Sequence, residues 1–149
     1  MSVWFEGEGE IACDIREVQQ ALENLGELFA GVVCLMPGLT SVELVEQGGD
    51  FVTIKTNEGL MKRTNFSKHI EDARIVLEFD ERYEAGSKVT ATSHFVHEFA
   101  TAGTGVAHRL TMSGVEAPGF LGFFYRSFGS SKTGNAFLEA YKSHLEAST

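Results

Sequence analysis

The chain has 149 residues, 43% of them hydrophobic, which is typical of one compact domain with a single core. Its 12 Lys and Arg against 21 Asp and Glu give a formal net charge of −9, and the basic residues form no cluster, which argues against nucleic acid as a partner. The sequence contains no transmembrane segment and no signal-peptide pattern, so we expect one cytoplasmic domain over residues 1–149.

The N-terminal part of the sequence predicts one strand and two helices. Residues 3–11 alternate with a period of two, which indicates a half-exposed strand. Capping-box patterns at residues 14–17 and 24–27 then predict two short helices between residues 14 and 36.

From residue 40 onward, turn signals rich in Gly, Asn, Asp and Glu recur at regular spacing. They delimit six predicted strands, at residues 40–47, 50–56, 60–70, 73–83, 87–101 and 104–114. The links are too short for crossover connections, so neighbouring strands must be antiparallel. The last strands are long, and we therefore expect the sheet to curl strongly.

Residues 118–146 predict an amphipathic C-terminal helix that begins at Pro118. As one straight rod this helix would measure ~43 Å, which is too long for a small domain. Gly129 and Gly134 would each destabilise a helix interior by about 1 kcal/mol. We therefore predict a kink or break within residues 129–134.

Three segments resemble parts of the START-like superfamily, also called SRPBCC or helix-grip proteins. The segment IACDIREVQQAL resembles the passage from the first strand to the first helix of these proteins. The segment MPGLTSVELVEQGG resembles their Pro-Gly entry to the second strand and the following turn, and GNAFLEAYKSHLE resembles their closing helix. The order of elements is also similar over the whole chain. The resemblance implies an α+β helix-grip fold, in which a curled seven-stranded antiparallel sheet wraps around a long C-terminal helix and encloses a cavity for an apolar or aromatic molecule. Known members include lipid-transfer domains and polyketide cyclases or dehydratases, so membership leaves the function open.

The inward faces of the strands are assigned from the more apolar alternate residues. Together with the C-terminal helix they give the candidate ligand-binding residues Phe66, Phe79, Tyr83, Phe95, His97, Phe99, His108, Leu110, Met112, Phe120, Phe124, Phe137 and Tyr141. The preferred hypothesis is that these residues bind or transport a small apolar or aromatic ligand. The alternative for the rings is that they fill a dry core.

Three histidines flank the turn at residues 102–103. A two-residue turn there places His97 opposite His108 on the inward face, with β-carbons about 5 Å apart, and His94 on the outer face. The inward pair has three interpretations: a polar anchor for a ligand, a hydrogen-bonded part of the core, or the catalytic general base of a cyclase-type or dehydratase-type enzyme. No third metal ligand is evident beside the pair, so we expect neither a metal nor a cofactor.

A second polar pair follows from reading residues 71–72 as a two-residue turn. Lys62 then faces Glu81 on the inward side, either as an ion pair at the rim or as two side chains that reach water separately. A three-residue loop at residues 84–86 is predicted to pair Glu81 with Val89 on the next strand. Measured along the strands through Val89, Glu81 then lies ~27 Å from His97, so we expect the two pairs near opposite ends of the domain.

Aromatic residues that cannot all face a cavity suggest a further alternative. Trp4 and the segment FLGFFYRSF, residues 120–128, could dock a partner protein or a second copy of the chain. On this hypothesis the protein is an interaction module, and a homodimer is the simplest assembly.

Overall fold

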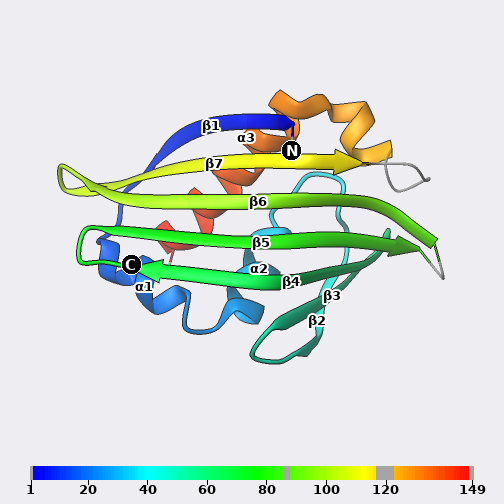
Figure 1. Ribbon diagram of the computed structural model, residues 1–149, viewed down its shortest axis with the longest axis horizontal. Coiled ribbons are helices and arrows are strands. Elements are labelled where there is room, and N and C mark those ends of the chain that lie inside the picture. Colours follow the sequence, from blue (N-terminus) through cyan, green and yellow to red (C-terminus); the bar gives the residue numbers. More distant parts are fainter. Residues whose placement is uncertain (1, 86–87, 117–122, 148–149) are drawn as a thin grey trace.

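The computed structural model describes residues 2–85, 88–116 and 123–147, and the side chains of residues 2–84, 91–116 and 129–147. In chain order its elements are β1 (Val3–Ile11), α1 (Ile15–Ala21), α2 (Leu25–Val33), β2 (Val42–Gln47), β3 (Phe51–Thr56), β4 (Gly59–Ile70), β5 (Arg74–Ala85), β6 (Lys88–Ala102), β7 (Gly105–Glu116) and α3 (Phe123–Ala147). The described strands form one seven-stranded antiparallel sheet in the order β1-β7-β6-β5-β4-β3-β2, with the helices on one side of it (Figure 1). The predicted α+β architecture is confirmed.

The inner face of the sheet carries the core. Along β5, alternate side chains from Ile75 to Tyr83 are buried, whereas those between them are partly or fully exposed. The same alternation continues through β6 and β7, and its buried sets agree with the inward faces predicted from the sequence. Helices α2 and α3 cover this face, so the apolar side chains of the sheet and the helices meet in one hydrophobic core.

Helix α3 is interrupted at Gly129, where φ is 71° and ψ is 173°. This conformation is readily available only to glycine, and it confirms the predicted break. After the break, α3 packs closely on β1, because a Cβ atom at Gly134 would lie only 2.2 Å from the Phe5 ring. The absence of a side chain at residue 134 therefore determines how near the helix lies to the first strand.

Two hairpin registers differ from those predicted. His97 lies opposite Leu110 and not His108, a shift of two residues, and Glu81 lies opposite Ser93 and not Val89, a shift of four. Side chains alternate between the faces with a period of two, so an even shift leaves each one on its predicted face. The inward assignment is therefore unaffected by these errors.

The register between β4 and β5 differs by one residue, and this has a larger effect. The ladder shifts at a bulge within residues 64–67, where Asn65 has a φ of 58°, and Arg63 lies opposite Glu81 in place of Lys62. An odd shift exchanges the two faces of a strand. Arg63 is therefore turned into the core and Lys62 to the outside.

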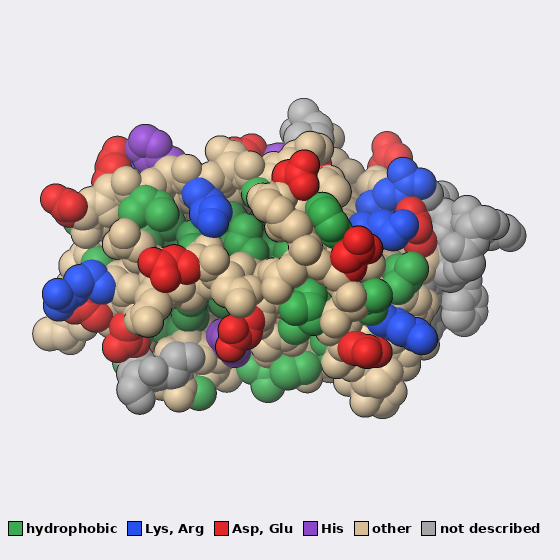
Figure 2. Space-filling model, turned by 90° about the horizontal axis from the view of Figure 1, so that it is seen from below, with side chains coloured by type: hydrophobic (Ala, Val, Ile, Leu, Met, Phe, Trp, Pro, Cys, Tyr) green, Lys and Arg blue, Asp and Glu red, His purple; other side chains and the backbone are tan. Residues whose placement is uncertain are grey.

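The surface is mixed in character. Figure 2 shows hydrophobic, acidic and basic side chains interspersed on one face of the molecule. Trp4 is partly buried and packs against the core, and the side chains of residues 120–128 lie outside those that the structure describes. The interaction module stays a prediction. Within the described residues, no helix is both long and apolar enough to cross a membrane.

Candidate ligand-binding site

A buried ion pair lies in the core beneath the sheet. Arg63 Nε and Nη2 donate to the same oxygen of Glu81, at 3.0 and 2.8 Å, and each side chain is only 1% exposed. The guanidinium carbon lies 4.5 Å from the ring centre of Phe29, 4.7 Å from that of Phe79 and 5.4 Å from that of Phe95. Removing two charges from water costs several kcal/mol per ion, so the pairing and these cation–π contacts are what make burial tolerable.

The predicted Lys62–Glu81 rim pair is replaced by two separate interactions. Lys62 pairs with Glu84 at 2.8 Å on the outer face, while Glu81 pairs with Arg63 inside. The hydrogen bond from Lys62, with the charge of Arg82, holds the pKa of Glu84 below its usual value. The one-residue shift at the β4 bulge is the physical reason for the exchange.

The two polar pairs are also closer than predicted. Glu81 lies opposite Ser93, which is four residues from His97 along β6, or about 14 Å at 3.4 Å per residue. The rings of Phe79 and Phe95 bridge the remaining space, with centroids 5.7 and 6.0 Å from that of His97. The expectation that the pairs occupy opposite ends is therefore wrong, because the hairpin register moved by four residues.

His97 and His108 are in direct contact in the core. His97 Nδ1 and His108 Nε2 are 2.9 Å apart, the ring centroids are 5.2 Å apart, and neither residue is exposed. They are diagonal neighbours across the hairpin, and Tyr141 packs against both rings. Burial, with the charges of His108 and Arg63, places the pKa of His97 well below its usual value. Burial lowers the pKa of His108 to about 3, so both rings are neutral at pH 7.

Two nitrogens of this histidine pair have no hydrogen-bond partner among the described residues. They are His97 Nε2 and His108 Nδ1, and both are buried. Because the pair shares one hydrogen between the rings, one of the remaining nitrogens carries a hydrogen and the other a lone pair. Leaving such a group unsatisfied costs about 1–3 kcal/mol, so a bound water or a polar ligand atom would be stabilised there.

The predicted aromatic wall is a packed cluster where its side chains are described. Ten of the thirteen candidates are buried: Phe79, Tyr83, Phe95, His97, Phe99, His108, Leu110, Met112, Phe137 and Tyr141. Phe79 stacks on Phe95 with centroids 5.1 Å apart, and Phe137 meets Phe95 edge-on at 5.3 Å. Phe66 is partly buried against Phe79, whereas the side chains of Phe120 and Phe124 lie outside the described residues.

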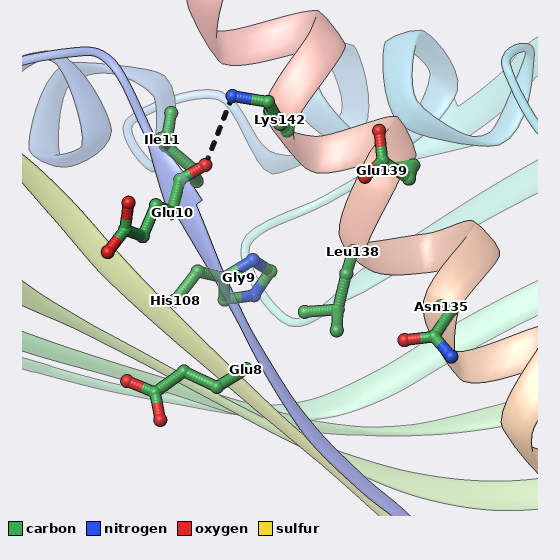
Figure 3. A pocket seen from close by; sticks show the side chains of 9 residues that line it. All are labelled: Glu8, Gly9, Glu10, Ile11, His108, Asn135, Leu138, Glu139 and Lys142. Atoms are coloured by element: carbon green, nitrogen blue, oxygen red, sulfur yellow. Dashed lines mark hydrogen bonds between the residues drawn. The ribbon is translucent and has the colours of Figure 1, made fainter.

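A groove of ≈ 460 Å³ opens between β1 and α3 (Figure 3). It is lined by Glu8, Gly9, Glu10, Ile11, His108, Asn135, Leu138, Glu139 and Lys142. Of the predicted binding residues whose side chains are described, His108 alone lines it, directly opposite Gly9 in the β1–β7 pairing. The groove therefore lies over the buried histidine pair.

Two glycines on the inner face of β1 leave room for neighbouring side chains, and Gly9 is the one that lines this groove. A Cβ atom at Gly7 would lie 2.5 Å from the Phe5 ring and 3.3 Å from Leu138 Cδ1, and one at Gly9 would lie 3.9 Å from Leu138 Cβ. Phe5 and Leu138 therefore occupy the space beside Gly7, and Leu138 alone lies near Gly9. At the side of the groove Lys142 donates to the Glu10 carbonyl at 3.2 Å, as the dashed line in Figure 3 shows.

Sequence reasoning missed Arg63 and most of the groove. A signal for the groove was present in EGEGE, residues 6–10, where two glycines occupy successive inward positions of a strand and leave that face without side chains. No comparable signal identifies Arg63, because its orientation depends on the bulge at residues 64–67.

His94, which was predicted on the outer face, lies there between two carboxylates. Its Nδ1 is 2.6 Å from Asp80 and its Nε2 is 2.6 Å from Glu78. Partial burial lowers the pKa of His94, but the hydrogen bonds with Asp80 and Glu78 outweigh this effect, so the net pKa is raised. The cluster lies on the opposite face of β6 from His97.

We expect an NMR titration of His94 to give a pKa above 6.5, and Asp80→Asn to lower it. The pKa of His94 is higher in the folded chain than in the unfolded chain, where it is ~6.5. The stability contributed by protonated His94 is therefore fully present below pH ~6.5 and is lost as the pH rises through the folded-state pKa. His94, Asp80 and Glu78 are partly exposed, so their interactions should contribute less than ~1 kcal/mol to the free energy of unfolding. A His94 pKa at or below 6.5 would contradict the geometry.

Known structures share this architecture, although no protein-family model and no curated protein matches the chain. A STAR-related lipid transfer protein from Xanthomonas axonopodis superposes with a TM-score of 0.62 at 14% identity, covering 94% of this chain and 84% of that one. Ara h 8.0201 gives a TM-score of 0.62 at 14% identity, with 98% and 99% covered. A conserved protein from Geobacillus kaustophilus gives 0.60 at 16% identity, with 96% and 95% covered.

The chain has a START-like helix-grip fold. The resemblance read from the sequence is confirmed at the level of the fold, since the matched chains agree over nearly the whole length. START-like proteins have diverse functions, so the fold by itself does not identify a ligand or a reaction.

Proposed function

We propose that this START-like protein binds a small apolar or aromatic molecule in the groove between β1 and α3, above His108. The observation that carries the proposal is that His108, whose buried Nδ1 has no partner among the described residues, lines that groove. Apolar surface from Ile11 and Leu138 supplies contact area, and His108 supplies an orienting polar group. One structural neighbour is described as a lipid transfer protein, which is compatible with this proposal.

The geometry supports a polar anchor better than a catalytic base. A general base works best when its pKa is near the operating pH. Burial lowers the pKa of His108 to about 3 and places that of His97 well below its usual value, so both rings are weak bases at pH 7. A neutral imidazole can nevertheless donate or accept a hydrogen bond with a ligand, which is what an anchor requires.

A substitution that fills the groove tests the proposal. We expect the wild-type protein to bind the fluorescent probe N-phenyl-1-naphthylamine saturably, and Gly9→Leu to weaken that binding by about tenfold or more, equivalent to about 1.4 kcal/mol. A Cβ atom at Gly9 has ordinary contact with Leu138, so the fold should accept the change while the rest of the leucine covers His108. Fluorescence titration gives both affinities.

Gly49→Leu is the matched control. A Cβ atom at Gly49 has nothing within 4 Å, so the same leucine is added far from the groove and should leave probe affinity unchanged. Equal weakening by both substitutions, or no saturable binding to the wild type, would contradict the proposed site. Native mass spectrometry of the purified protein can then identify a co-purified molecule.

A further inference from the structure

We infer that the groove selects ligands whose polar end is an uncharged hydroxyl group and rejects carboxylates with the same apolar skeleton. The inference rests on the proposed binding function and adds the chemical class of the ligand. Two independent features of the site carry it: the hydrogen-bonding character of the histidine pair and the charges around the groove.

The histidine pair can present His108 Nδ1 as a donor or as an acceptor. If His97 Nδ1 donates across the 2.9 Å contact, His108 Nδ1 carries its hydrogen; if His108 Nε2 donates, His108 Nδ1 carries a lone pair. A hydroxyl group can satisfy either form because it both donates and accepts. A carboxylate can only accept, so it can use one form alone and brings a full charge to a buried position.

Among the described side chains that line the groove, none offers a carboxylate ligand a free positive charge. Glu8, Glu10 and Glu139 line it, and Lys142 is the one basic residue in this described lining. Lys142 Nζ is already 2.5 Å from Glu146 and donates to the Glu10 carbonyl. Because the histidines are neutral at pH 7, an anionic ligand would meet net negative charge, whereas a neutral ligand would not.

Access to His108 involves Leu138. The His108 side chain has no exposed surface, and Leu138, which is 6% exposed, lies over the glycines of β1 beside it (Figure 3). Leu138 is buried in the seam between α3 and β1, and a change to another staggered rotamer would uncover the His108 ring without moving the backbone. Binding therefore requires Leu138 to turn aside, so that the ligand hydroxyl replaces it above Nδ1.

Three naphthalenes of equal skeleton test the selectivity. In competition with N-phenyl-1-naphthylamine at pH 7, we expect 1-naphthol to bind at least about tenfold more tightly than 1-naphthoate and severalfold more tightly than 1-methylnaphthalene. In addition, ¹⁵N NMR of the imidazoles should show a shift of His108 Nδ1 with 1-naphthol and a much smaller one with 1-methylnaphthalene. These measurements use the unmodified full chain, so they do not depend on whether a variant folds.

Charge variants separate the effect of the groove's acidic residues from that of the hydrogen bond to His108. Glu8→Gln/Glu139→Gln should narrow the preference for 1-naphthol over 1-naphthoate by severalfold. Glu23→Gln/Glu43→Gln makes the same change in net charge at exposed positions outside the groove and should leave the preference unchanged.

The outcomes distinguish this inference from the proposed function. If 1-naphthoate competes as well as 1-naphthol while Gly9→Leu still blocks the probe, the ligand class is wrong and the binding site stands. Equal affinity for 1-methylnaphthalene and 1-naphthol would likewise overturn the hydrogen bond to His108. If the probe does not bind saturably, the proposed function itself fails.

Discussion

Replacing Arg63 with alanine is expected to lower the free energy of unfolding by about 3–5 kcal/mol. Arg63 and Glu81 are each 1% exposed and joined by two hydrogen bonds, so the substitution leaves the Glu81 carboxylate buried without the cation that neutralises it. It also removes the guanidinium that packs over the core phenylalanines. Urea denaturation at pH 7, followed by circular dichroism, measures the change.

The neighbouring residue provides the control. Lys62→Ala removes an ion pair with Glu84 on the exposed side of the same strand and should cost only about 0–1 kcal/mol. The double substitution Arg63→Met/Glu81→Leu should recover most of the stability lost in Arg63→Ala, because it removes both buried charges at similar volume. If Arg63→Ala and Lys62→Ala lowered the free energy of unfolding equally, Arg63 would not be buried in an ion pair with Glu81.

Lowering the pH is expected to destabilise the fold through the histidine pair. The folded-state pKa of His108 is lowered to about 3 and that of His97 well below its usual value, whereas both return to ~6.5 on unfolding. Below pH ~6.5 the unfolded chain therefore binds more protons than the folded chain, so the free energy of unfolding decreases as the pH is lowered. Each imidazole contributes a slope that approaches about 1.4 kcal/mol per pH unit. When the pH is lowered from 7 to 5, the two histidines together should reduce the free energy of unfolding by about 3–4 kcal/mol.

The double variant His97→Phe/His108→Leu should remove most of this histidine-dependent slope. It also removes the unpartnered nitrogens, and its apolar side chains suit an environment that contains Phe95, Phe99 and Tyr141. Urea midpoints at pH 5, 6, 7 and 8 give the comparison. As a control, His94→Gln should leave the acid slope of the pair in place, since His94 lies on the opposite face and its raised pKa acts in the other direction. An unchanged slope in the double variant would mean that other groups cause the acid sensitivity.

The sequence by itself determined the order of elements, the break in α3 and the face on which most strand residues lie. These features depend on local patterns: alternation along β1, β5, β6 and β7, capping residues before α1 and α2, and the glycines at residues 129 and 134, which disfavour a helix interior. His97 and His108 could be placed together for the same reason. Their hairpin register was predicted wrongly by two residues, but an even error does not move a side chain to the other face.

Only the tertiary structure decided which cation enters the core and where a ligand could reach the histidines. The bulge at residues 64–67 changes the register of β4 by one residue, and pairing across both neighbouring strands decides such a bulge, so Arg63 and not Lys62 meets Glu81. The groove over His108 depends on how closely α3 approaches β1. That distance follows from the contacts of Gly134 with Phe5 and of Leu138 with Gly7 and Gly9, residues more than a hundred positions apart, whose packing no local pattern encodes.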